Sequence, residues 1–264
     1  MNTNSNVYTV IYTTIVVVIV AAALAFVAQK LGPAQQANEK AETLRQMMAA
    51  AQVKTSDELY ASKNADILQL YADNIEQAYT IGKDGKQNGT LGTSKDKIEL
   101  ISNLKPQDNA IKKDADVTLP VYQFKGGIRV IPVYGAGLWG PIWGYLAISS
   151  DCKTIAGAYF DHASETPGLG AKIKDEPWFR EKFAGKKVAF GSEQLFMLTK
   201  NAEETGADNA VDAITGATMT SKGLNAALNV WLKAYESHVE SIALEEKAIE
   251  ENAIVENNQI NEEE

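Results

Sequence analysis

Hydroxyl side chains crowd one short stretch, "DAITGATMTSKG", residues 212–223. They surround a glycine and an alanine, in the order Thr215, Gly216, Ala217, Thr218, Thr220 and Ser221. A Ser or Thr oxygen accepts hydrogen bonds from N–H groups in the first turn of a helix, but one such cap is enough. The same turn carries unpaired N–H groups and the positive end of the helix dipole, which favour an anion such as phosphate. Helix capping and binding of a phosphate-bearing ligand both fit this pattern.

A second stretch, "HASETPGLGAKI" at residues 162–173, has the composition of a stiff loop. Pro167 fixes one φ angle, while Gly168 and Gly170 permit positive φ, so the loop presents Leu169 at its tip. A stiff apolar tip suits a flat ring better than a flexible polar ligand. The alternative is an ordinary turn between a strand and a helix.

Polar residues before that tip could serve the edge of such a ring. We expect Glu165 to accept hydrogen bonds from ring N–H groups, with Thr166 beside it. His162 and Glu165 supply only one imidazole and one carboxylate, which is too little for a zinc site, so no metal is expected. A third stretch, "GAGLWGPIWG" at 135–144, offers Leu138 and Trp139 as another apolar surface.

Nucleophilic catalysis is another use of hydroxyl groups. Thr218 or Ser221 would need a neighbouring base, and one of the two histidines, His238, lies far along the final helical region. The sequence contains neither the G-x-S-x-G elbow nor the G-x-x-x-x-G-K-[ST] phosphate loop. We therefore expect no catalytic residue of this kind.

The elements around these stretches follow from their periodicity. Four apolar residues after the hydroxyl cluster recur at helical spacing: Leu224, Leu228, Trp231 and Tyr235. "VTLPVYQF", "IRVIPVYG", "IWGYLAISS" and "TIAGAYFDH" predict an antiparallel meander over 117–162. Helices do not alternate with these strands, so a parallel dinucleotide-binding sheet is not expected. The single Cys152 excludes an internal disulfide and is expected to be buried in a strand.

The N-terminal part predicts a membrane anchor and helices. Val7–Ala28 runs 22 residues without a charge, and about 20 residues suffice to span a bilayer as helix. A cleaved signal peptide is the alternative, but "MNTNSN" has no basic residue. Residues 33–53 have a helical pattern that predicts a stalk helix. A second helical pattern covers 62–82, and a Gly- and Lys-rich loop is predicted at 83–97. Lys30 and Arg45 after the anchor weakly predict a cytoplasmic globular part.

The net charge of −9 is confined to the C-terminus. Residues 236–264 contain ten Glu and one Lys, so this acidic tail accounts for the whole imbalance. We expect it to be a partly disordered, solvated segment. Neither half of the chain has a basic stripe, so nucleic acid is not an expected partner.

Taken together, these motifs resemble a known family. "DAITGATMTS" resembles the flavinylation motif Asp-x-x-[Ser/Thr]-Gly-Ala-Thr-x-[Ser/Thr], with Thr215 where Ser is common. "ETPGLGAKI", "GLWGPIWGYLAI" and "EPWFREKFAGKKV" are similar to further signatures of the C subunit of the sodium-translocating NADH:quinone oxidoreductase. The resemblance spans about residues 7–235 and includes the order of anchor, stalk, inserted segment and flavin domain. The acidic tail matches nothing in that family.

The resemblance implies a covalent cofactor and a membrane complex. FMN would be joined through a phosphoester to Thr218 by a separate flavin transferase that uses FAD as donor. Thr215, Thr220 and Ser221 would solvate the linkage, and the small Gly216 and Ala217 would let the phosphate approach the backbone. The chain would carry electrons between other subunits of the complex, contributing to quinone reduction and sodium export.

The resemblance also implies a location and an architecture. The globular domain would lie on the periplasmic side of the bacterial inner membrane, against the weak Lys and Arg count. We expect an α+β fold: an anchor (1–30), a stalk and helical segment (31–115), an antiparallel-sheet FMN-binding domain flanked by helices (116–235) and the tail (236–264). The alternatives are the G subunit of the related Rnf complex and an anchored binding or scaffold domain without flavin.

Overall fold

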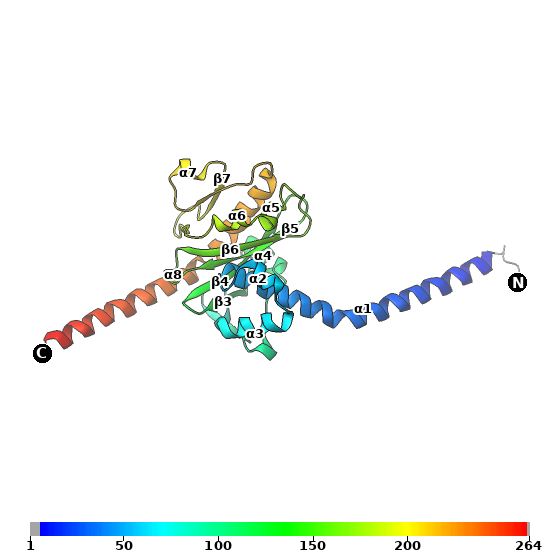
Figure 1. The fold of residues 1–264 in the computed structure, drawn as a ribbon, viewed down its shortest axis with the longest axis horizontal. Helices are drawn as coiled ribbons and strands as arrows, with labels where there is room; N and C mark the ends of the chain where they lie inside the picture. Colours follow the sequence, from blue (N-terminus) through cyan, green and yellow to red (C-terminus); the bar gives the residue numbers. More distant parts are fainter. Residues whose placement is uncertain (1–5, 263–264) are drawn as a thin grey trace. The chain divides into compact units, whose positions relative to one another are not determined.

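The computed structural model describes residues 6–262, with the backbone alone from residue 246 onward. The chain divides into two units, Met1–Glu42 and Thr43–Glu264. The second unit is an α+β domain built on a six-stranded antiparallel sheet (Figure 1), which confirms the expected fold class.

The first helix, α1, runs without interruption over Asn6–Ala50. The predicted anchor and stalk are therefore one helix, with Pro33 inside it. The part that lies in the first unit contains a strongly apolar window, of mean hydropathy 2.8, none of which is buried. Among the described residues it is the one helix long and apolar enough to cross a membrane. Its length and composition suit a single-pass membrane anchor.

Short helices connect and flank the sheet of the second unit. Their bounds are α2 (Ser56–Ala61), α3 (Asn64–Asn74), the 3₁₀ turn η1 (Lys95–Lys97), α4 (Lys105–Lys112), α5 (Lys172–Asp175), α6 (Pro177–Glu181) and α7 (Ala202–Thr205). A final long helix, α8, spans Thr218–Glu262. Thr55 and Glu58 form a reciprocal capping box at the start of α2, which satisfies two backbone donors at once.

The sheet has the strand order β2-β1-β3-β4-β5-β6, and every neighbouring pair is antiparallel. The strands are β1 (Ile75–Ile81), β2 (Gln87–Leu91), β3 (Leu119–Phe124), β4 (Ile128–Ala136), β5 (Pro141–Ile148) and β6 (Ile155–His162). The predicted meander is thus confirmed as β3 to β6. A separate parallel pair joins β7 (Met197–Thr199) to β8 (Ala210–Asp212). Cys152 is buried as expected, but it lies in the β5–β6 turn at φ 58°.

Two predictions for the segment before the meander are wrong. The helix expected over 62–82 ends at Asn74, and the chain continues as β1. The loop expected over 83–97 contains β2, which pairs with β1 as a hairpin. Ile75 and Tyr79 continue the helical spacing of Ile67 and Tyr71, yet pairing of β1 with both β2 and β3 overrides that periodicity.

Helices cover both faces of the sheet. On one face α8 packs against β4, and α4 packs against both. On the other face lie α2, α3 and the C-terminal part of α1. There the ring of Tyr71, from α3, packs edge to face against the ring of Phe124, from β3. Gln46 of α1 donates to Asp161 of β6 at 3.0 Å. Burial on two faces explains why these strands are almost continuously apolar instead of alternating.

The predicted apolar face of α8 forms much of the core. Its buried apolar residues include Leu224, Ala227, Leu228, Trp231, Leu232, Tyr235 and Val239. Tyr235 also donates its hydroxyl to the carbonyl of Pro120, at 2.8 Å. The helix continues past residue 235, where the tail was expected to begin, and its packing against the core reaches Ala243. The greater part of the predicted disordered segment lies outside the residues whose side chains are described.

A buried histidine joins α8 to the β1–β2 hairpin. The ring Nδ1 of His238 lies 2.8 Å from the Gly85 carbonyl, and its Nε2 lies 3.0 Å from the Tyr79 hydroxyl. A carbonyl only accepts, so Nδ1 carries the proton and Nε2 accepts from Tyr79. Burial lowers the pKa of His238 below its ordinary value of 6.5, and the nearby Arg129 charge adds to this effect.

This arrangement predicts a pH-dependent contribution to stability. A depressed pKa means that the unfolded chain takes up the proton first, so the contribution is complete above about pH 6.5 and is lost as the pH falls. We expect His238→Asn to lower the free energy of unfolding by about 1–2 kcal/mol at pH 8. The variant should also lose less stability than the wild type between about pH 7.5 and 5.5. Thermal unfolding of the detergent-solubilised chain checks this, and equal pH slopes would contradict it.

Candidate functional site

The three glycine-rich stretches occupy three different loops of the second unit. The "GLWG" residues form the turn between β4 and β5, closed by a bond from the Gly137 N–H to the Gly140 carbonyl at 2.8 Å. The "ETPGLG" residues follow β6 and lead into α5. The hydroxyl cluster lies between β8 and the first turn of α8. One side chain, that of Glu165, connects all three.

The Glu165 carboxylate is buried, with 5% of the residue exposed, and each of its oxygens accepts a hydrogen bond. Oε1 accepts from the backbone N–H of Trp139 at 2.9 Å. Oε2 accepts from the hydroxyl of Thr220 at 2.5 Å. Charge-assisted bonds of this kind are about twice as strong as neutral ones. We call this arrangement the Glu165 tether.

Glycines allow the three loops to approach this carboxylate. A Cβ atom on Gly137 would lie 2.4 Å from Glu165 Oε1. One on Gly170 would lie 2.3 Å from Oε2 and 2.5 Å from the Thr220 hydroxyl. Further along α8, a Cβ on Gly223 would lie 2.1 Å from the Ala136 carbonyl oxygen. Real Cβ atoms do not come this close, so glycine is needed at each position for the loops and α8 to meet.

The four hydroxyls of the cluster divide into two classes. Thr220 is 1% exposed and bonded to Glu165, while buried Ser221 accepts from the Ile214 N–H at 3.1 Å. Thr215 and Thr218 are exposed. In the described part of the chain, neither of these two makes a hydrogen bond. The two buried hydroxyls thus hold the loop together, and the two exposed ones are left for another partner.

The backbone of the cluster forms a tight turn ahead of α8. The Ala217 N–H donates to the Ile214 carbonyl at 3.1 Å, and Gly216 adopts φ +82° between them. Only glycine adopts this conformation without strain. α8 then begins at Thr218, so the residue expected to carry the cofactor is the first residue of a long helix.

The motif aspartate, Asp212, has a structural role on the other side of this turn. Its Oδ2 accepts from Lys182 Nζ at 2.8 Å, and its Oδ1 accepts from the Ala202 N–H at 2.8 Å. The bond from Lys182 is the main reason that the pKa of Asp212 lies below its usual value. Asp212 therefore fixes the end of β8 to α7 and to the segment after α6.

Large apolar side chains are exposed on the loops that the tether connects. Their exposed fractions are 51% for Leu138, 66% for Trp139, 44% for Leu169 and 56% for Met219. A Cβ on Gly216 would lie 3.0 Å from Leu169 Cδ2, so the predicted loop tip lies against the hydroxyl turn. Met219 follows Thr218 directly and was not predicted, because a single Met inside a motif carries no periodic signal.

The remaining predicted residues take supporting positions. Thr166 closes the loop turn, its carbonyl accepting from Leu169 and Ala171 at 3.1 Å each. Gly168 has φ +75°, as the loop prediction requires. Nδ1 of His162 accepts from the Glu165 N–H at 3.1 Å. His162 therefore supports the backbone that carries the tether.

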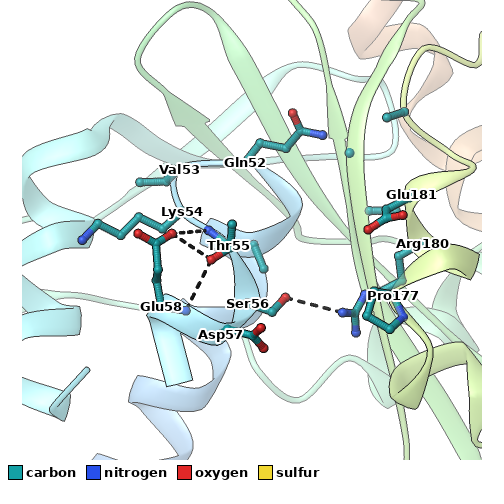
Figure 2. A pocket seen from close by; sticks show the side chains of 14 residues that line it. Gln52, Val53, Lys54, Thr55, Ser56, Asp57, Glu58, Pro177, Arg180 and Glu181 are labelled. Carbon is teal, nitrogen blue, oxygen red and sulfur yellow. Dashed lines mark hydrogen bonds between the residues drawn. The ribbon is translucent and has the colours of Figure 1, made fainter. Parts of the chain in front are cut away.

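A cleft of about 780 Å³ lies elsewhere in the second unit (Figure 2). Its walls are the end of α1 with residues 52–58, the Gly157–Ala158 part of β6, and α6 with Ala184. Arg180 reaches from one wall to the Ser56 hydroxyl on the other, at 3.5 Å. None of the predicted site residues lines this cleft, which makes it distinct from the tethered loops.

Comparison with known proteins identifies the family of the domain that carries these loops. A family profile described as FMN-binding domain matches residues 137–233, which include all three loops. The C subunit of the Na(+)-translocating NADH-quinone reductase of Neisseria meningitidis serogroup A is 33% identical over 183 residues, covering 64% of this chain and 70% of that protein. The same subunit of Yersinia pestis is 38% identical over 105 residues, 39% of each chain.

Two crystal structures share the fold. The C subunit of the Na(+)-translocating NADH-quinone reductase from Parabacteroides distasonis superposes with a TM-score of 0.63 at 28% identity, covering 78% of this chain and 94% of that one. The NqrC structure from Shewanella oneidensis gives a TM-score of 0.58 at 26% identity, covering 76% and 97%. With its sequence and its fold in agreement, the chain belongs to the C-subunit family of Na(+)-translocating NADH-quinone reductases.

Proposed function

We propose that this chain is the covalent-FMN electron-carrier subunit of a membrane complex that couples NADH oxidation and quinone reduction to sodium export. In this proposal a separate flavin transferase esterifies FMN through its phosphate to Thr218. The Thr218 hydroxyl loses its proton and forms the new P–O bond, while the pyrophosphate bond of the FAD donor breaks and AMP leaves. Bound FMN supplies the electron-transfer chemistry, and the protein supplies position, electrostatics and protection. Electrons then reach and leave this chain through the other subunits.

The observation that carries the proposal is the contrast among the four hydroxyls. Thr218 is exposed and unbonded within the described residues, at the first position of α8, whereas Thr220 and Ser221 are buried and bonded. The first N–H groups of a helix have no partner within it, and they favour an anion. A phosphate on Thr218 would therefore meet N–H donors, with Thr215 exposed beside it.

The fit of the flavin ring rests on the exposed apolar side chains. Leu169 and Met219 flank the hydroxyl turn, and Leu138 and Trp139 extend the apolar surface on the neighbouring loop. Exposed apolar surface of this kind is typical of a binding site. We place the ring against Leu169, with Leu138 and Trp139 as the alternative platform, and a structure of the flavin-bearing protein distinguishes the two.

The attachment site is tested by mass spectrometry of the chain expressed with an active flavin transferase. The peptide containing "ITGATMTSK" should carry the mass of FMN on Thr218. Thr218→Ala should abolish attachment without unfolding the domain, since the side chain is exposed and unbonded. Thr218→Ser keeps the hydroxyl and should retain part of the FMN attachment. An unmodified Thr218 in protein made with an active transferase would refute the proposal.

The side of the membrane is a second part of the proposal. We place the globular unit on the periplasmic side, as the family resemblance implies. Arg45, one of the basic residues that follow the anchor, has a structural function: it donates to the Leu59 and Ser62 carbonyls at 3.0 and 2.9 Å. Its presence after the anchor is therefore accounted for by folding.

Protease added to intact spheroplasts tests this placement. We expect the globular unit to be cleaved from outside, leaving the anchor in the membrane. A cytoplasmic marker protein that stays intact is the control for membrane integrity. Protection of the unit in intact cells, with cleavage only after lysis, would reverse the topology.

A further inference from the structure

We infer that Glu165 is a positioning residue whose bond to Thr220 sets the orientation of Thr218 and thereby controls FMN attachment. The inference rests on the proposed function, because it concerns the same acceptor hydroxyl. Glu165 lies 53 positions before Thr218, outside the flavinylation motif. It acts on the acceptor only through Thr220, which lies in the same first turn of α8 as Thr218.

The geometry of α8 explains how the bond orients the acceptor. Successive residues of a helix are about 100° apart around its axis, so residues two positions apart point to nearly opposite sides. Thr220 points inward, where Glu165 Oε2 accepts its hydroxyl at 2.5 Å. Thr218, two positions earlier, is consequently directed to solvent, as its exposure shows. Rotation of the first turn would carry Thr218 away from the surface.

The tether has little freedom to move. Glu165 Oε1 is held by the Trp139 N–H, and the Ser164 hydroxyl donates to the Trp139 carbonyl at 3.0 Å, so two bonds link the same pair of loops. His162 accepts from the Glu165 N–H at 3.1 Å and fixes its backbone. Gly137 and Gly170 lie directly against the two carboxylate oxygens, where a Cβ atom would clash with them.

Burial of the carboxylate argues for positioning over ring recognition. Each carboxylate oxygen has a lone pair left for a second bond, but only 5% of Glu165 is exposed, so a flavin N–H group has little access to it while the bonds to Trp139 and Thr220 are in place. Leaving the buried Thr220 hydroxyl without a partner costs about 1–3 kcal/mol. We therefore assign the Glu165 carboxylate to the protein loops in the flavin-bearing state as well.

The test uses the full chain, expressed with the flavin transferase, in wild-type and variant forms. Glu165→Gln can keep both contacts, because its amide oxygen accepts from Trp139 and its NH₂ group donates to the Thr220 oxygen. Glu165→Leu and Thr220→Val remove the bond, and Thr220→Ser restores the hydroxyl. Glu193→Leu and Thr90→Val, both at exposed positions away from the three loops, are the matched controls.

We expect Glu165→Leu and Thr220→Val to slow FMN attachment about tenfold or more, because the acceptor is no longer held in place. Glu165→Gln, Thr220→Ser and both controls should stay within about twofold of the wild type. The rate is followed by intact mass well below the unfolding temperature of each variant, so a loss of stability is measured separately. Rescue by the two conservative variants distinguishes positioning from a general effect on folding.

Wild-type attachment rates in Thr220→Val would overturn the inference, whatever the behaviour of Glu165→Leu. Equal slowing in Thr220→Ser and Thr220→Val would overturn it too, since the hydroxyl would then be irrelevant. If the wild type itself carries no FMN, the proposed function fails. The two failures are therefore distinguishable in one experiment.

Discussion

A buried carboxylate without partners would be among the most costly features of a small domain, and Glu165 shows how this fold avoids that cost. Its two oxygens take donors from two separate loops, Trp139 and Thr220. To satisfy the charge, the β4–β5 turn, the loop after β6 and the first turn of α8 must come together. The site at Thr218 is a consequence of this requirement.

The rest of the domain brings those three loops within reach. β4, β5 and β6 are consecutive antiparallel strands, so the turn after β4 and the loop after β6 emerge at the same end of the sheet, where these strands finish. α8 packs along β4. The close approach of Gly223 to the Ala136 carbonyl brings the first turn of α8 to that end of the sheet. The apolar residues of α8 then pack the helix against the core as far as Ala243.

The sequence was sufficient for the parts whose signals are local. The α8 stripe, the four strands of the meander and the positive φ of Gly168 follow from residue type and spacing. The β1–β2 hairpin could not be predicted in this way, because Ile75 and Tyr79 also satisfy a helical period. Only the pairing of β1 with the distant β3 decides between a helix and a strand. Tertiary contacts override local periodicity in such short segments.

In the candidate site, the sequence identified the motif residues but not the contacts that define their roles. The residues of the motifs were found, but the roles of Thr220, Ser221 and Glu165 depend on partners 7 to 55 positions away in the sequence. A sequence pattern cannot show that a hydroxyl is buried and already bonded. The exposure of Met219 was missed for the same reason, since the orientation of the first turn of α8 depends on the tether.

The most direct measurement is a crystal structure of the flavin-bearing protein at a resolution that separates the two Glu165 oxygens. The account predicts that Oε1 still accepts from the Trp139 N–H, that Oε2 still accepts from Thr220, and that the phosphate is attached to Thr218 with the ring against Leu169. A Glu165 carboxylate that has left Thr220 and bonds to a ring N–H group would contradict it.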